Sequence, residues 1–200
     1  MSALTELNEE IARCYLCEIA KDRCHVVPGE GAEDADILFI GEAPGWHEDQ
    51  QGRPFVGPAG KYLEDLLALV NLDRTQVFIT NVIKCRPPNN RDPFPIEISN
   101  CRNWLDRQVE IIRPKLIVTL GRYSMAKFFP GKTISKAHGT VQKWNGISCY
   151  AMYHPAAALH QQSLRRTIEE DMRRVPSLLA GTAPGPEVES QPRQLNMFEV

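Results

Sequence analysis

The feature that most constrains the fold of this sequence is an alternation of short apolar runs with longer amphipathic segments between residues 36 and 179. The apolar runs, rich in β-branched and aromatic residues, lie at 37–41, 77–81, 116–121 and 149–154. Each is too short for a helix and is typical of a strand buried on both faces. The segments between and after them predict helices over 59–70, about 96–112, 122–129 and about 163–179.

This repeated strand–helix order predicts an α/β protein with a parallel sheet and helices on both faces. The segment before Val70 supports the helical assignment, because Tyr62, Leu63, Leu66 and Leu67 fall on one stripe of a helix. In such sheets ligands bind beyond the carboxyl ends of the strands. We therefore expect the functional residues at those ends.

Length and composition predict one folded domain over residues 1–180 and a disordered tail over 181–200, which is rich in Pro, Gly, Glu and Gln. The formal net charge of −2 excludes a protein that coats nucleic acid by bulk electrostatics. No apolar run approaches the roughly 20 residues that span a bilayer. The polar, acidic N-terminus is unlike a signal peptide, so we expect a cytoplasmic protein.

Six cysteines in such a protein indicate metal binding or catalysis rather than a disulfide framework. Two form a C-x-x-C pair, and the full set is Cys14, Cys17, Cys24, Cys85, Cys101 and Cys149. Four thiolates suit either an iron–sulfur cluster or a tetrahedral zinc ion, and their chemistry alone leaves both open.

Two Gly/Pro-rich loops follow the first predicted strand. Residues 41–45 place Glu42 in a rigid turn where a ligand can approach the backbone, although a plain turn with an exposed carboxylate fits as well. Phe55 lies in the second loop, where its ring could serve as a stacking platform or pack into the core. The pattern leaves each alternative open.

Two further polar residues lie at strand ends. Asn81 ends the second strand, and its amide can pair with a base edge through one donor and one acceptor. His154 ends the fourth strand beside a proline, where a histidine is often structural. A histidine, an asparagine and a glutamate at the ends of one parallel sheet nonetheless favour a common site.

Spaced motifs identify a family resemblance. The motifs are GEAPGWHED at 41–49, GRPFVGPAG at 52–60, TNVIKCRPP at 80–88 and HPAAAL at 154–159, after the C-x-x-C pair. In this order they resemble the family 4 uracil-DNA glycosylases, the iron–sulfur branch, from about residue 14 to 179. The resemblance implies a three-layer α/β/α fold with a central four-stranded parallel sheet. It also implies a monofunctional DNA N-glycosylase that flips uracil out of DNA and hydrolyses its N-glycosidic bond, leaving an abasic site for base excision repair.

The resemblance implies a structural [4Fe–4S] cluster on Cys14, Cys17, Cys85 and Cys101. Cys24 could compete for a ligand position by its spacing. Cys149 lies within an apolar strand and is expected to be a buried thiol.

The resemblance also implies the uracil pocket. Gly41, Glu42 and Ala43 would line it, Phe55 would stack on the ring, and Asn81 would pair with N3–H and O4 of uracil. His154 would lie near O2, where charge develops as the bond to the sugar breaks.

The water-activating group is less defined. The best-known uracil glycosylases carry an aspartate where this chain has Ala43. Glu42 is therefore expected to orient water or stabilise the sugar cation, with Glu48 as second candidate. Glu48 or its loop is also the candidate for filling the C5 side of uracil and excluding thymine.

Contacts with single- or double-stranded DNA require local positive charge. The candidates are Lys84, Arg86 and Arg91 after the second strand and Arg165 and Arg166 after the HPAAAL loop, with Leu159 as an apolar wedge. Ordinary solvated surface is the alternative for these cations. We expect a monomer, associated with the nucleoid.

The tail carries a second motif. Gln194, Leu195, Met197 and Phe198 resemble the pentapeptide by which bacterial proteins dock on the replication sliding clamp.

Two rival functions remain at this point. The first is a non-catalytic iron–sulfur protein that binds uracil-containing DNA without cutting it. The second is a nucleotide-binding protein that uses its cluster for electron transfer, although the chain lacks a GxGxxG fingerprint after the first strand.

Overall fold

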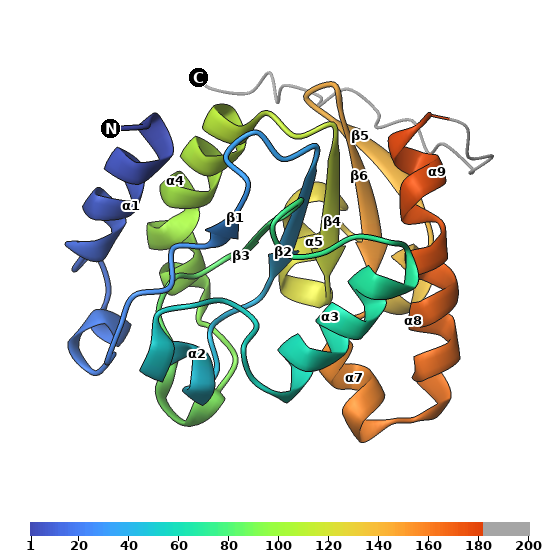
Figure 1. The fold of residues 1–200 in the computed structure, drawn as a ribbon. Coiled ribbons are helices and arrows are strands. Elements are labelled where there is room, and N and C mark those ends of the chain that lie inside the picture. Colours follow the sequence, from blue (N-terminus) through green and yellow to red (C-terminus); the bar gives the residue numbers. More distant parts are fainter. Residues whose placement is uncertain (182–200) are drawn as a thin grey trace, which may run out of the picture.

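A six-stranded sheet forms the centre of the molecule (Figure 1). The computed structural model describes residues 1–181. The strands run in the order β1-β3-β2-β4-β6-β5, and the four inner strands pair in parallel. Their bounds are β1 Glu30–Gly31, β2 Ile37–Gly41, β3 Phe78–Asn81, β4 Leu116–Leu120, β5 Val141–Trp144 and β6 Ile147–Met152. The predicted α/β class and central four-stranded parallel sheet are confirmed.

The two antiparallel edge strands were not predicted. β1 has only two residues, which is too short for a periodic pattern. β5 and β6 form a hairpin around Asn145 and Gly146, both with positive φ.

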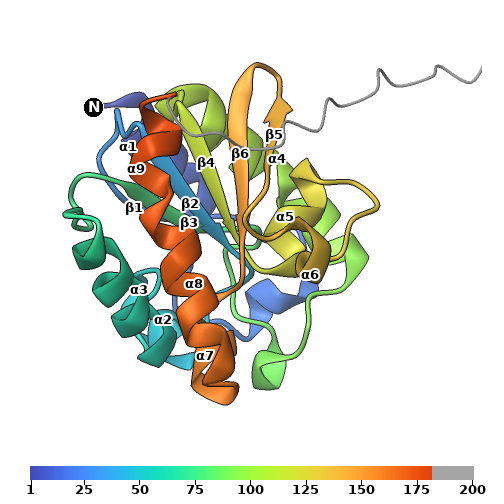
Figure 2. The same ribbon diagram turned by 90° about the vertical axis from the view of Figure 1, so that its right-hand side faces the viewer.

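Helices cover both faces of the sheet (Figure 2). Alternate residues of β2 face opposite layers, because Leu38 and Ile40 belong to one core cluster and Ile37 and Phe39 to the other. The first cluster packs against α1 Ala3–Ala12, α4 Pro95–Ile112 and α5 Arg122–Phe128. The second packs against α3 Pro58–Leu69, α7 Pro155–His160, α8 Ser163–Arg173 and α9 Val175–Leu179. This is a three-layer α/β/α arrangement.

The helix predictions hold with one correction. The single helix expected over 163–179 is two helices that meet at Arg174, where Pro176 lacks the N–H that a continuous helix would use. Four helices were not predicted, namely α1, α2 Trp46–Gln51, α6 Ile134–Ala137 and α7, which occupies the HPAAAL segment.

Parallel pairing brings the strand ends together at one edge of the sheet, at the bottom of Figure 1. Gly41 is the register partner of Asn81, and the carboxyl end of β6 leads into α7 through His154. Among residues 1–181, no helix is long and apolar enough to cross a membrane. The predicted tail, with its clamp motif, lies almost wholly outside the described residues.

Candidate active site at the carboxyl edge of the sheet

A buried, unpartnered amide oxygen lies at the centre of this edge. Asn81 is 1% exposed, and within residues 1–181 its Oδ1 has no hydrogen-bond partner. Leaving such an acceptor unpaired costs about 1–3 kcal/mol, so a ligand that donates to it would recover that free energy. The sequence order alone could not show that this oxygen is left free.

Gly41 brings three groups to the same place. A Cβ at this position would lie 2.3 Å from Oδ1 of Asn81 and 2.6 Å from Cζ of Phe55. Only glycine permits this close approach, because real Cβ atoms do not come this near to other heavy atoms. Gly41, at the end of β2, therefore lies directly against both the Asn81 amide and the Phe55 ring.

Phe55 packs into the core, which is one of the two alternatives considered for it. Its side chain is buried, and its ring stacks on the His154 ring with centroids 5.5 Å apart and planes 25° apart. The backbone φ of Phe55 is 51°, a left-handed conformation that costs a bulky residue about 1–3 kcal/mol. Surrounding contacts must compensate for this strain.

His154 is held as a neutral imidazole. Its Nδ1 accepts the Ala156 N–H at 3.1 Å at the start of α7, so the proton of the neutral ring resides on Nε2. Desolvation lowers the pKa of His154 to about 4, against the opposing charge of Glu48. The ring is therefore an uncharged N–H donor at neutral pH.

The pKa of Glu42 is shifted upward, in the opposite direction to that of His154. Desolvation and, to a smaller extent, the charge of Asp92 raise the pKa of Glu42 from 4.5 to about 7, against the opposing charge of Arg122. A carboxylate with a pKa close to the working pH is suited to accept a proton. Asp92 and Arg122 were missed, although Arg122 lies two residues after the end of β4, where ligand-binding residues of a parallel sheet are expected.

Both carboxylate oxygens of Glu48 already accept hydrogen bonds from backbone N–H groups. Its Oε1 accepts the N–H groups of Val56 and Gly57 at 2.9 and 2.8 Å, and its Oε2 accepts that of Gly45 at 3.1 Å. The carboxylate thus ties the loop after β2 to the Phe55 loop. Ala43 is partly buried and packs against the core beside this site.

The four predicted cluster ligands line one small cavity. Cys14, Cys17, Cys85 and Cys101 all border it, and Cys24 is not among its lining residues. Cys24 is exposed, and its Sγ accepts a hydrogen bond from Gln50. Cys149 is a buried thiol in β6, as expected.

Two side chains that sequence reasoning missed donate to these sulfurs. Trp104 Nε1 lies 3.3 Å from Sγ of Cys14, and Arg23 Nη1 lies 3.2 Å from Sγ of Cys85. Such donors stabilise thiolates. Among the described residues that line the cavity, these four thiols are the only His, Cys, Asp or Glu side chains, which fits a four-cysteine cluster. In the described part of the chain, no group of three or more His, Cys, Asp or Glu side chains could hold a metal ion as it stands.

The prediction that Lys84 contacts DNA is wrong. Its side chain is 1% exposed, and its Nζ donates to Thr80 Oγ1, Asn81 O and Gln108 Oε1 at 2.6, 2.8 and 2.6 Å. A buried amino group enclosed by three internal acceptors cannot reach a phosphate. Lys84 instead braces the end of β3 beneath Asn81.

The other predicted DNA contacts lie at the surface. Arg86 is bonded to Asn90, and Arg91 is bonded to Glu97 through both of its terminal nitrogens. Arg165 and Arg166 form exposed ion pairs one turn along α8, which contribute little and exchange readily for a phosphate. Leu159 is 50% exposed on α7.

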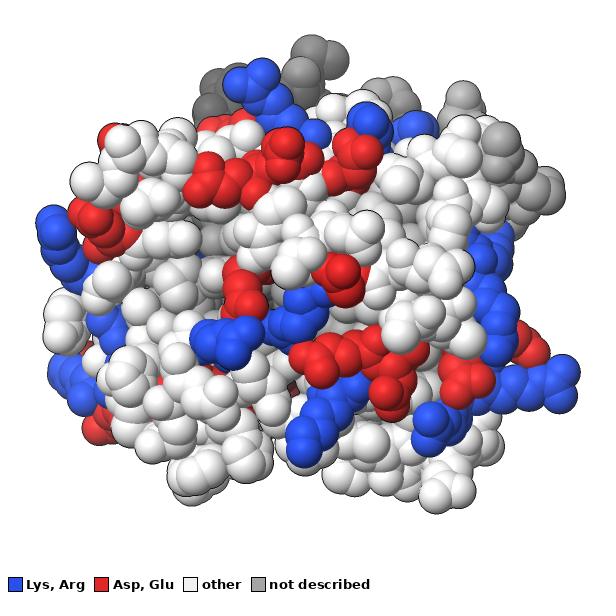
Figure 3. Space-filling view, in the orientation of Figure 1, with Lys and Arg blue, Asp and Glu red and all other residues white. Residues whose placement is uncertain are grey.

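Charge on the surface is mixed. Lys and Arg side chains alternate with Asp and Glu over the face drawn in Figure 3, and the described residues form no continuous basic surface there. Blue side chains gather along the right edge, over α8. On this face, contact with a polyanion would depend on local cations.

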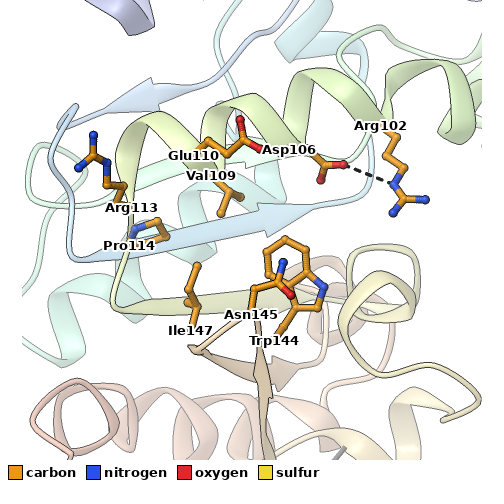
Figure 4. A pocket seen from close by; sticks show the side chains of 9 residues that line it. All are labelled: Arg102, Asp106, Val109, Glu110, Arg113, Pro114, Trp144, Asn145 and Ile147. Carbon is orange, nitrogen blue, oxygen red and sulfur yellow. Dashed lines mark hydrogen bonds and ion pairs between the residues drawn. The ribbon is translucent and has the colours of Figure 1, made fainter. Parts of the chain in front are cut away.

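A separate cavity of about 460 Å³ lies between α4 and the β5–β6 hairpin (Figure 4). It is bordered by residues that precede β4 and begin β6, such as Pro114 and Ile147, so it lies toward the amino ends of these strands. Its lining is Arg102, Asp106, Val109, Glu110, Arg113, Pro114, Trp144, Asn145 and Ile147. None of these is a predicted site residue.

Fold and site together define an α/β/α protein with a buried amide, a neutral histidine and an aromatic ring at the carboxyl edge of its parallel sheet. The family model of the uracil DNA glycosylase superfamily matches residues 28–175. A type-4 uracil-DNA glycosylase of Sulfurisphaera tokodaii is 47% identical over 188 residues, covering 89% of this chain and 86% of that protein.

Two further relatives carry the same printed name. The type-4 enzyme of Archaeoglobus fulgidus is 44% identical over 193 residues, covering 92% of this chain and 97% of that protein. That of Thermotoga maritima is 42% identical over 178 residues, covering 86% and 93%. The chain therefore belongs to the uracil DNA glycosylase superfamily, and within it to the type-4 family.

Proposed function

We propose that this protein is a uracil-DNA glycosylase that flips uracil out of DNA and hydrolyses its N-glycosidic bond, leaving an abasic site for base excision repair. The observation that carries the proposal is the unpartnered, buried Oδ1 of Asn81 beside Gly41 and Phe55. Uracil carries an N–H at N3 that would satisfy this oxygen.

Base selection follows from the amide. Asn81 accepts from N3–H through Oδ1 and donates to O4 through Nδ2, while Phe55 stacks on the ring. Cytosine has an acceptor at N3 and a donor at C4, so both contacts would be mismatched. Two mispaired buried groups at about 1–3 kcal/mol each give strong discrimination.

Departure of the base is assisted by His154. Cleavage of the N1–C1′ bond leaves a uracil anion with charge on O2, and the Nε2–H of the neutral imidazole is available to donate there. A preorganised donor of this kind lowers a barrier by about 3–4 kcal/mol. The Nδ1 contact with Ala156 keeps the ring in the productive tautomer.

We assign the activation of the attacking water to Glu42 alone. Its raised pKa keeps it available to take a proton near neutral pH, whereas Glu48 is occupied by three backbone donors. The water attacks C1′ of the oxocarbenium-like sugar and transfers a proton to the Glu42 carboxylate. Glu48 acts by fixing the loops that shape the pocket.

Cys14, Cys17, Cys85 and Cys101 would hold a [4Fe–4S] cluster. Glycosidic hydrolysis needs no electron transfer, so the cluster would supply a structural cross-link among four thiolates. The residues that it joins belong to the segment after α1, the loop after β3, and α4. Trp104 and Arg23 support the thiolates by hydrogen bonding.

DNA would lie along the carboxyl edge. Arg86, Arg91, Arg165 and Arg166 supply phosphate contacts, and the half-exposed Leu159 on α7 fills the space left by the flipped base. Cytoplasmic location with nucleoid association and a monomeric state complete this proposal.

The test of this function is uracil release from an oligonucleotide with one uracil, with thymine and cytosine controls and alkali cleavage of the product. Strand breaks only in the uracil substrate are expected. Retained binding to uracil-containing DNA without any release would contradict catalysis and favour the non-catalytic binder.

The tail motif carries a separate proposal. Gln194, Leu195, Met197 and Phe198 lie outside the described residues, and their resemblance to a sliding-clamp ligand supports docking on that ring. Deletion of residues 190–200 is expected to abolish clamp binding in a pull-down while uracil release from oligonucleotides is unchanged. Clamp binding that survives the deletion would overturn the proposal.

A further inference from the structure

The strained backbone of Phe55 is held from outside its own loop by an arginine. Arg74 lies between α3 and β3, and its Nη1 donates to the carbonyl oxygen of Phe55 at 2.9 Å. Its Nη2 donates to the carbonyl oxygen of Pro54 at 2.5 Å. One guanidinium therefore fixes two consecutive peptide units, which the planar fork of arginine can do and a lysine cannot.

Two acidic side chains hold the guanidinium in turn. Glu64 on α3 lies 3.4 Å from its Nη1, and Glu30 of β1 lies 3.8 Å from its Nη2. The Arg74 side chain is only 14% exposed, so solvent competes weakly for these contacts. The guanidinium is thus anchored on elements outside the pocket.

A carboxylate, that of Glu48, holds the peptide units that follow Phe55. Glu48 accepts the N–H groups of Val56 and Gly57, while Arg74 binds the carbonyl oxygens of Pro54 and Phe55. Gly60 packs directly against the Phe55 carbonyl oxygen, because a Cβ at position 60 would lie 1.9 Å from that oxygen. Contacts to the peptide units before and after Phe55 therefore hold its backbone in the left-handed conformation.

We propose that Arg74 is a positioning residue that holds the Phe55 backbone in its left-handed conformation, so that the ring is set for stacking on the flipped base before substrate arrives. This inference rests on the proposed uracil pocket. Arg74 does not touch the base, and its whole effect on the reaction passes through the Phe55 ring.

A double-mutant cycle tests this dependence. The substitutions are Arg74→Ala, Phe55→Ala and the two combined, compared by kcat/KM for uracil release and by inhibition with free uracil. Each single variant is expected to lose about tenfold to a hundredfold in kcat/KM, as misplaced binding groups do. Because both remove the same stacking contact, the combined variant should fall within about twofold of Phe55→Ala.

Arg53→Ala is the matched control. Arg53 shares Glu30 with Arg74 but bonds to that carboxylate and not to the loop carbonyls, so this variant should retain wild-type kcat/KM. If Arg74→Ala fails to fold, Arg74→Lys keeps the charge, loses the two-carbonyl fork and should show the same non-additivity.

The outcomes separate the two proposals. Losses that multiply in the combined variant, or an unchanged Arg74→Ala, would overturn the positioning role while leaving the glycosylase intact. A wild-type protein that neither releases nor binds uracil would overturn the proposed function and this inference together.

Discussion

At the residue scale, the site is defined by groups whose ordinary states are altered by burial. Asn81 keeps an unpaired oxygen, His154 is kept neutral and Glu42 is kept partly protonated near neutral pH. The unpaired amide oxygen and the ionised form of Glu42 each cost folding free energy in the absence of a ligand. Groups perturbed in this way are typical of active sites.

The Glu42 carboxylate makes a pH prediction. Uracil release at saturating substrate should rise with pH through about 7, because the carboxylate must be ionised to accept a proton. Glu42→Gln should remove this limb and lower the rate by about 10²–10⁴. Single-turnover rates between pH 5 and 9 measure both effects, and an unchanged limb in the variant would contradict the assignment.

The same residue makes a stability prediction. The folded pKa of Glu42 lies above its ordinary value of 4.5, so the ionised form destabilises the folded protein fully above about pH 7 and not at all below 4.5. Glu42→Gln should therefore raise the Tm at pH 8 and leave it nearly unchanged at pH 4.5. Thermal unfolding at the two pH values checks this, with Glu9→Gln as an exposed control; equal shifts at both would contradict it.

At the element scale, the inner strands and the helices that follow them were predictable, whereas the edge strands and helices α1, α2, α6 and α7 were not predicted. The four inner strands and the cores of α3, α4 and α5 follow from continuous apolar runs and helical stripes. The split at Arg174 was readable from Pro176, and the β5–β6 hairpin from the Asn145-Gly146 pair, a strong turn signal. β1, with two residues, carries no pattern of its own and depends on its pairing with β3.

The N-terminal segment makes a prediction about the cysteines. Cys101→Ser should lose most bound iron and the brown colour and expose the segment after α1 to limited proteolysis, because a cross-link to α4 is removed. Cys24→Ser and Cys149→Ser are the matched controls and should keep their iron. Iron content, measured chemically, decides; full iron in Cys101→Ser or its loss in Cys24→Ser would contradict the ligand set.

At the scale of the whole molecule, the site was predictable because parallel strands deliver their carboxyl ends to one edge. Gly41, Asn81 and His154 are far apart in sequence and converge for that reason alone. The tertiary contacts could not be predicted. Lys84 is buried against Gln108, and Arg74 donates a hydrogen bond to the Phe55 loop. Each contact joins segments about 20 residues apart that carry no shared motif.

The most direct test of the account is the single-turnover rate of uracil release by the wild type and by Asn81→Ala, both loaded with iron. We expect the wild type to release uracil but not cytosine or thymine, and the variant to lose about a hundredfold or more in rate. An Asn81→Ala protein that releases uracil at the wild-type rate would contradict the claim that this buried amide selects the base.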